Sequence, residues 1–98
     1  MRLWVDDVRI APDGYIWAKS VYDAREEIVN SELQGTPYTL INIDHDAGSY
    51  LSEGGSYMRF LEWLEETGRN YPIHIHSVNH AAVENMRQII QRNGWKEV

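Results

Sequence analysis

Cysteine is absent from this sequence, which excludes disulfides, thiolate catalysis and zinc sites built from cysteine. Basic residues are also scarce, since 9 Lys and Arg stand against 15 Asp and Glu. A groove for long nucleic acid needs a basic surface, so such a polymer is not an expected partner. No apolar run approaches a membrane span and no basic, apolar leader is present, so we expect a soluble, cytoplasmic protein with no membrane partner.

What is present fits one folded domain spanning residues 1–98. Hydrophobic residues make up 43% of the chain, with four Trp and six Tyr, which argues against disorder. The acidic excess is uneven: residues 1–56 hold ten acids and four Lys or Arg, while residues 57–98 hold five of each. This distribution fits a cation-binding site, although an acidic surface kept for solubility would explain it as well.

Three short apolar segments end abruptly in polar residues. Each segment is typical of a buried strand, and in open α/β sheets ligands bind just beyond the carboxyl ends of the strands. We therefore expect one rim of the sheet to carry most of the chemically useful side chains. These are Asp6 and Asp7 at the end of the first strand, Asp44, His45 and Asp46 after the central strand, and Ser77 and Asn79 after the last.

The order of elements is predicted from turn signals, caps and periodicity. Strands are expected at 2–6, 15–19, 40–43 and 73–76, with a short fifth edge strand at 95–98. Ser20 and Asn79 are expected to cap two of the three helices. The apolar faces of these helices are predicted to be Val21, Ala24 and Ile28 in the first, Tyr57, Phe60, Leu61 and Leu64 in the second, and Val83, Met86, Ile89 and Ile90 in the third.

Alternation along the strands predicts a sheet covered on one face only. The aliphatic face is Leu3, Val5, Ile16, Ala18, Ile41, Ile43, Ile73 and Ile75. The other face is aromatic and polar: Arg2, Trp4, Asp6, Tyr15, Trp17, Lys19, Leu40, Asn42, Asp44, His74 and His76. The eight residues between the first two strands are too few for a helical crossover, so these strands are parallel without a helix or form a loose hairpin. The open face is left for solvent, a ligand or the second subunit of a homodimer.

The acidic residues at the rim suggest a divalent cation. Asp6, Asp7, Asp44 and Asp46 would supply the carboxylate oxygens that Mg²⁺ or Mn²⁺ prefers, and like charges are costly to cluster unless a cation joins them. The plainer alternative is that these aspartates cap turns. His76 could act as general acid or base, and with Asp44 a transition-metal site is conceivable.

Other rim residues are expected to contact a substrate. Ser77 could orient a phosphoryl group, and Asn79 could do the same, although helix capping already explains Asn79. His45 lies near the rim, and Trp17 and Lys19 lie on the open face, where Trp could stack on a base. His74, inside a strand, is better explained as a structural histidine.

These motifs together resemble the cyclic-phosphate-processing receiver-like family, a reduced relative of response-regulator receiver domains. They are Leu-Trp-Val-Asp-Asp-Val-Arg at 3–9, Asp-Gly-Tyr-Ile-Trp-Ala-Lys at 13–19, Ile-Asp-His-Asp at 43–46 and His-Ser-x-Asn at 76–79. The resemblance implies a receiver-like (flavodoxin-like) α/β fold with a mainly parallel sheet of four or five strands and three helices mostly on one face. It also implies processing of cyclic phosphates at RNA ends, as in RNA repair, or of related nucleotides, with site residues Asp6, Asp7, Asp44, Asp46, His76 and Ser77.

Two departures from true receivers bear on function. The helix between the first two strands is missing, and no fifth strand ends in Lys, which disfavours phosphotransfer from a histidine kinase. The leading hypothesis is a metal-dependent phosphoesterase in which the aspartates hold the cation, His76 is acid or base and Ser77 orients the phosphate. The alternatives are a non-catalytic module that binds or sequesters cyclic nucleotides, and a degenerate phospho-receiver.

Overall fold

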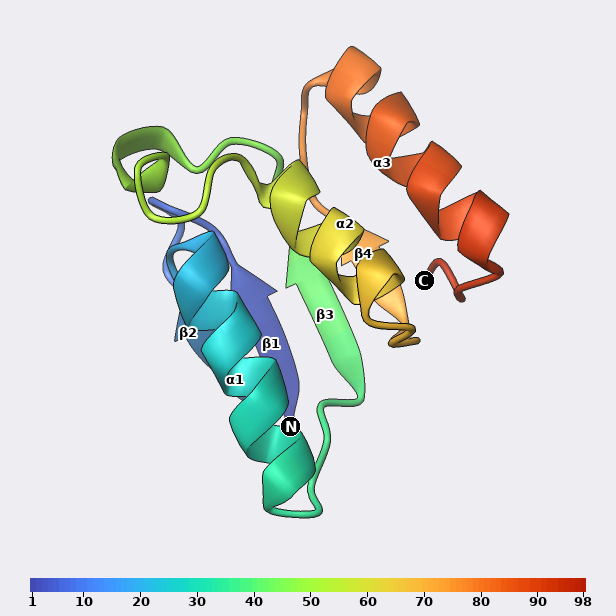
Figure 1. Ribbon diagram of the computed structural model, residues 1–98. Coiled ribbons are helices and arrows are strands. Elements are labelled where there is room, and N and C mark those ends of the chain that lie inside the picture. Colours follow the sequence, from blue (N-terminus) through green and yellow to red (C-terminus); the bar gives the residue numbers. More distant parts are fainter.

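Four parallel strands form one sheet in the order β2-β1-β3-β4 (Figure 1). The computed structural model describes all 98 residues. The strands are β1 (Arg2–Val5), β2 (Tyr15–Ala18), β3 (Leu40–Ile43) and β4 (Ile73–Ile75). The predicted receiver-like α/β fold is therefore confirmed, with β1, β2 and β4 each one residue shorter than expected.

Three helices lie on one side of this sheet, as Figure 1 shows. They are α1 (Val21–Leu33), α2 (Tyr57–Glu66) and α3 (His80–Asn93), and a short 3-10 turn, η1 (Gly48–Tyr50), precedes α2. The predicted caps are confirmed, because Ser20 Oγ accepts from the Asp23 amide and Asn79 Oδ1 from the Ala82 amide. No helix has both the length and the hydrophobicity needed to cross a bilayer.

The core lies between the helices and the aliphatic face of the sheet. It contains the predicted strand residues Leu3, Val5, Ala18, Ile41, Ile43 and Ile73, and the predicted helix residues Val21, Ala24, Ile28, Tyr57, Phe60, Leu61, Leu64, Met86, Ile89 and Ile90. The predicted burial was wrong for three residues. Ile16 is 38% exposed because β2 is an edge strand, Ile75 is half-buried, and α3 buries Ala82 more fully than Val83.

The first two strands are parallel with no helix between them. The connecting loop is held against the sheet end by two amides, since the Val8 and Arg9 N–H groups both donate to Asp6 Oδ1 at 2.9 Å. Trp4 Nε1 also donates to the Arg9 carbonyl at 2.9 Å. These contacts hold the loop that takes the place of a crossover helix. Because no helix lies between β1 and β2, the second face of the sheet has no helical layer.

The chain's own aromatic rings cover part of that open face. Trp4 stacks on His76 with ring centroids 4.0 Å apart, and the edge of Tyr15 meets Trp4 at 5.6 Å. Two cations lie over rings of the same layer: the Arg2 guanidinium is 4.5 Å from the centre of Tyr15, and Lys19 Nζ is 4.4 Å from Trp17. The open face is thus an ordered aromatic and cationic surface of half-buried rings.

The predicted edge strand at 95–98 is reduced to a single bridge between Ile73 and Glu97. Two backbone hydrogen bonds join it to β4, from Ile73 N to the Lys96 carbonyl and from Val98 N to the Ile73 carbonyl. Trp95 turns into the core directly after the left-handed Gly94, so the chain leaves α3 pointing inward before it reaches β4.

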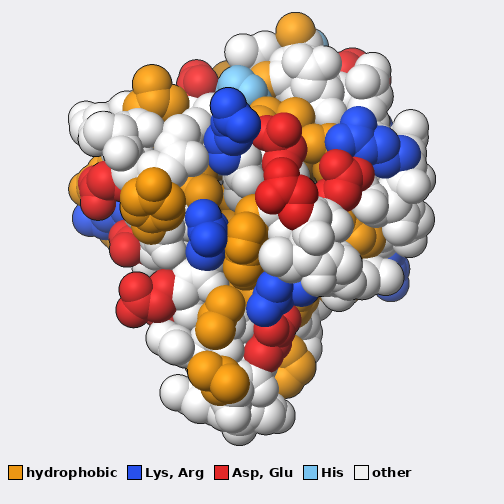
Figure 2. Space-filling model, viewed as in Figure 1, with side chains coloured by type: hydrophobic (Ala, Val, Ile, Leu, Met, Phe, Trp, Pro, Cys, Tyr) orange, Lys and Arg blue, Asp and Glu red, His pale blue; other side chains and the backbone are white.

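The helix-covered face carries mixed charge, and Figure 2 shows acidic and basic side chains lying side by side across it. Three arginine–glutamate pairs link elements there: Arg69 with Glu32 at 2.9 Å, Arg92 with Glu65 at 2.7 Å and Arg87 with Glu97 at 2.7 Å. The excess negative charge in the first 56 residues therefore lies mainly outside these pairs.

We predict that the open face forms a homodimer, because Trp and Tyr are enriched in interfaces and no helix covers them here. Light scattering at micromolar concentration should give about twice the 11.4 kDa mass of one chain. Leu40→Glu, on this face, should give monomers, whereas the matched variant Leu33→Glu at the exposed end of α1 should not. A monomeric wild-type protein would contradict the prediction.

Candidate functional site

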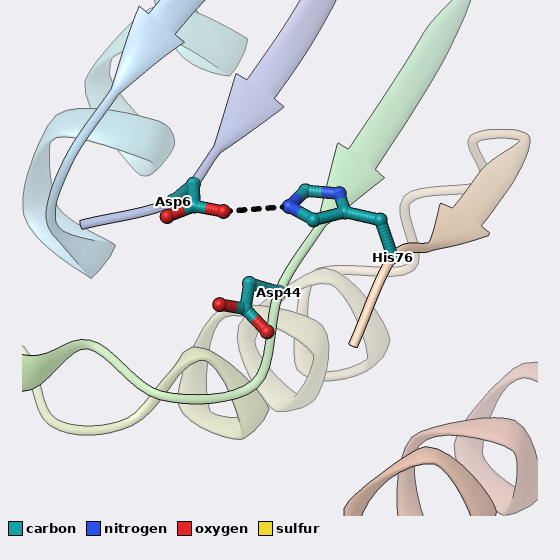
Figure 3. A group of neighbouring side chains, drawn as sticks. All are labelled: Asp6, Asp44 and His76. Atoms are coloured by element: carbon teal, nitrogen blue, oxygen red, sulfur yellow. Dashed lines mark hydrogen bonds and ion pairs between the residues drawn. The ribbon is translucent and has the colours of Figure 1, made fainter. Parts of the chain in front are cut away.

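Three adjacent strands deliver three ligand-type side chains to one point. Asp6 follows β1, Asp44 follows β3, and His76 follows β4, and one ligand atom from each lies within 4.8 Å of the others (Figure 3). Backbone hydrogen bonds continue one residue beyond the strands and fix these positions: Asp44 N donates to the Val5 carbonyl and His76 N to the Ile43 carbonyl, both at 2.9 Å. The arrangement is rigid because it is part of the sheet.

Asp6 is fully buried at the centre of this group. Its Oδ1 accepts from the Val8 and Arg9 amides, and its Oδ2 lies 2.8 Å from His76 Nε2. Burial alone would raise the pKa of Asp6, but the two amides and His76 outweigh it and hold the pKa below its usual value. Asp6 is therefore a permanent negative charge inside the protein at neutral pH.

His76 is held on both sides and on one face. Nε2 faces Asp6, Nδ1 faces Asn42 Oδ1, and the indole of Trp4 is stacked on the ring. Burial lowers the pKa of His76 below its ordinary value, against the opposing effects of Asp6 and Asp44. A neutral ring with one acidic and one amide neighbour is the state that this environment favours.

Asp7 and the glycine-containing loop form the outer side of the group. Burial raises the pKa of Asp7, and the charges of Asp6 and Asp44 raise it further. Gly48 lies so close that a Cβ there would be 2.1 Å from Asp7 Oδ2. The loop that follows Asp44 and Asp46 therefore approaches the acidic group through Asp7.

The structure does not bring every predicted residue together. Asp46 is largely exposed and pairs with His45 at 3.2 Å, outside the Asp6–Asp44–His76 group. Ser77 is half-buried beside the group in sequence, and its Oγ accepts from the Asn79 amide at 3.2 Å, so both residues also shape the start of α3.

The two predicted substrate residues on the open face are engaged with the protein itself. Trp17 Nε1 donates to the Asp6 carbonyl at 2.8 Å, and Lys19 lies over the Trp17 ring. His74, expected to be structural, has Nδ1 2.7 Å from the Val98 carbonyl. These contacts make Trp17 a support for Asp6.

Two residues that shape the site were not predicted. Asn42 sits in the middle of β3 and is 9% exposed, and a polar amide in a buried strand was the signal that could have identified it. Arg9 donates from its guanidinium to the His76 carbonyl at 3.0 Å and places a positive charge at the rim. Only its position in the loop after Asp7 could have suggested that contact.

The larger hollows of the surface lie elsewhere. A groove of about 420 Å³ runs between α1 and α2 beside Arg25, Arg59 and Trp63. The acidic group instead lies on an open rim of the sheet. We identify it as the candidate site from its ligand-type side chains, because no deep pocket marks it.

We predict that Gly48→Ala displaces the Asp7 carboxylate at little extra cost in stability. Gly48 and Gly35 both have positive φ, but a Cβ on Gly35 meets nothing within 4 Å, so Gly35→Ala is the matched control. Each change should cost about 1 kcal/mol in urea unfolding because of the backbone conformation. Only Gly48→Ala should weaken Mn²⁺ binding measured by calorimetry. Equal Mn²⁺ affinity in both variants would show that Asp7 takes no part.

Comparison with known proteins identifies the family of the chain. Residues 1–92 match the family described as Cyclic-phosphate processing Receiver domain. No curated protein and no solved structure matches the chain. The match covers the four strands, the loops that carry the acidic residues, and almost all of α3. The chain therefore belongs to the cyclic-phosphate processing receiver domain family.

Proposed function

We propose that this protein is a metal-dependent phosphoesterase that acts on cyclic phosphates of RNA ends or nucleotides. The observation that carries the proposal is the group Asp6, Asp44 and His76, which offers three ligand atoms within 4.8 Å at the strand ends of a cyclic-phosphate processing receiver domain. In parallel α/β sheets this is the edge where ligands bind.

The residues present fit a divalent cation such as Mg²⁺ or Mn²⁺. Asp6 is ionised and fully buried. Burial raises the pKa of Asp7, and the charges of Asp6 and Asp44 raise it further, a repulsion that a cation would offset. Asp6, Asp44 and Asp7 would hold the ion, which supplies Lewis-acid stabilisation of a phosphoryl oxygen.

The chain's own residues would position the phosphate. Hydrolysis of a cyclic phosphodiester forms a bond from a water oxygen to phosphorus, breaks one ring P–O bond and transfers a proton to the leaving alkoxide. Arg9 offers a positive charge to the anionic substrate, and the Ser77 hydroxyl can donate to a phosphoryl oxygen at the start of α3. His76 Nε2 can either carry a proton for this reaction or bind the cation, but it cannot do both at once.

The binding-module alternative receives less support from the geometry. Its expected contacts, Trp17 and Lys19, are stacked on each other, and Trp17 also holds the Asp6 backbone. A sequestering protein would need these groups free for the ligand. An enzyme needs them only as a support for the acidic group.

The test is turnover of 2′,3′-cyclic nucleotides and cyclic dinucleotides, followed by mass spectrometry with Mg²⁺, with Mn²⁺ and with EDTA. We expect a ring-opened product that carries a phosphate monoester, and we expect EDTA to abolish its formation. Tight binding without product, unaffected by EDTA, would indicate the sequestering module and contradict the proposal.

Asp44→Asn should abolish turnover and leave the fold intact or slightly more stable, because it removes one of the clustered negative charges. Asn can still accept the His45 amide that Asp44 Oδ1 accepts at 2.8 Å. Asp13→Asn, in the exposed turn before β2, is the matched control and should keep full activity. Full turnover by Asp44→Asn with a lowered melting temperature would show that Asp44 is only structural.

Millimolar Mn²⁺ or Mg²⁺ should raise the melting temperature by mass action, since the site exists only in the folded chain. At a cation concentration of 100 times Kd the gain in unfolding free energy is about 2.7 kcal/mol. The double variant Asp6→Asn and Asp44→Asn should lose this gain. An equal shift in the double variant would place the bound cation elsewhere.

A further inference from the structure

We infer that His76 is itself a ligand of the cation, through Nε2, and that Asn42 holds it in the Nδ1–H tautomer, so that the site selects transition-metal ions over Mg²⁺. The inference rests on the proposed function for the existence of the cation and names the ion class of that same site. It assigns a positioning role to Asn42, because Asn42 hydrogen-bonds to His76 and Tyr15 and not to the carboxylates of Asp6 and Asp44.

The first argument is a count of protons around the His76 ring. Nδ1 faces Asn42 Oδ1 and Nε2 faces Asp6 Oδ2, and both of these oxygens are acceptors. Without a cation, a proton on each ring nitrogen would satisfy both contacts. A cation bound to Nε2 and Asp6 takes the place of the proton between them, and the remaining N–H at Nδ1 donates to Asn42.

The two atoms lie close enough to share one ion after a small outward movement. His76 Nε2 and Asp6 Oδ2 are 2.8 Å apart. Two donor atoms that each lie about 2.1 Å from one ion are separated by about 3.4 Å at the tetrahedral angle that Zn²⁺ prefers. Asp44 supplies the third ligand atom within the same 4.8 Å group, and Figure 3 shows its carboxylate beside the other two side chains.

Each of the three ligands is anchored on its far side. Asp6 Oδ1 accepts the Val8 and Arg9 amides, and Asp44 Oδ1 accepts the His45 amide. His76 Nδ1 is held by Asn42, whose Nδ2 donates to the Tyr15 hydroxyl at 3.4 Å. Metal sites in proteins orient their ligands by such outer hydrogen bonds, and here each side chain keeps one atom free for the ion.

The donor set determines the ion. Mg²⁺ favours oxygen ligands and retained waters, whereas imidazole nitrogen suits Zn²⁺ and other transition metals. Two carboxylates and one imidazole should therefore bind Zn²⁺ and Co²⁺ more tightly than Mn²⁺, and all three more tightly than Mg²⁺. This preference would not arise if Asn42 were turned over, because Nε2 would then carry the proton and donate it to Asp6.

The test is a pair of measurements on the folded protein without substrate. In ¹⁵N NMR the Zn²⁺-bound wild-type His76 should be the Nδ1–H tautomer, with its Nε2 signal shifted by the metal. Calorimetry should show Zn²⁺ binding at least 100-fold tighter than Mg²⁺ binding. Asn42→Ala should weaken Zn²⁺ binding about 10- to 100-fold. Asn42→Asp, which can still accept from Nδ1, should restore it.

His74→Gln is the matched control, because His74 lies on the same strand but contacts only the Val98 carbonyl, and it should leave the Zn²⁺ affinity unchanged. An Nε2–H tautomer that Zn²⁺ does not alter, or Mg²⁺ bound as tightly as Zn²⁺, would overturn the inference. Mg²⁺-dependent turnover alongside such spectra would overturn this inference and leave the phosphoesterase proposal standing. Tight Zn²⁺ binding through His76 with no turnover of any cyclic phosphate would overturn the phosphoesterase proposal and leave this inference standing.

Discussion

The parallel register of β1, β3 and β4 is the constraint on which the rest of the structure depends. Hydrogen bonds from Asp44 N to Val5 and from His76 N to Ile43 carry the ladder one residue past each strand end. The side chains that follow must then emerge at one edge, because parallel strands end together. A shift of one residue in the β1–β3 or β3–β4 pairing would move the side chains of one strand to the opposite faces of the sheet. A polar side chain of the site would then point into the helical core, and an aliphatic side chain would take its place.

The absence of a helix between β1 and β2 couples the open face to the site. Asp6 accepts two amides of the short loop, so the residue that is central to the acidic group also helps to hold the connection between the strands. Trp4 on the same face supports both the loop and the His76 ring. The aromatic rings provide the packing that a helical layer would otherwise provide on this side. They bury a smaller area than a helical layer would.

Local patterns predicted most of the elements, and long-range contacts account for what they missed. The caps Ser20 and Asn79 and the stripe from Tyr57 to Leu64 are encoded within a few residues, and so could be predicted. The exposed position of Ile16 depends on which strand lies at the edge, and the contact of Asn42 with His76 joins two strands. Asp46 was grouped with Asp44 by its place in the Ile-Asp-His-Asp motif and by the family resemblance, although the loop turns it toward His45 and solvent.

The 70 residues that separate Asp6 from His76 have a consequence for folding. Parallel strands cannot pair through tight hairpins, so the β1–β3 and β3–β4 pairings need long chain closures, and such topologies fold slowly. The acidic side chains of β1 and β3 would meet before the histidine of β4 joins them. During synthesis on a ribosome, the first half of the chain therefore carries the clustered aspartates without their histidine neighbour, and the group becomes complete only after β4 has emerged.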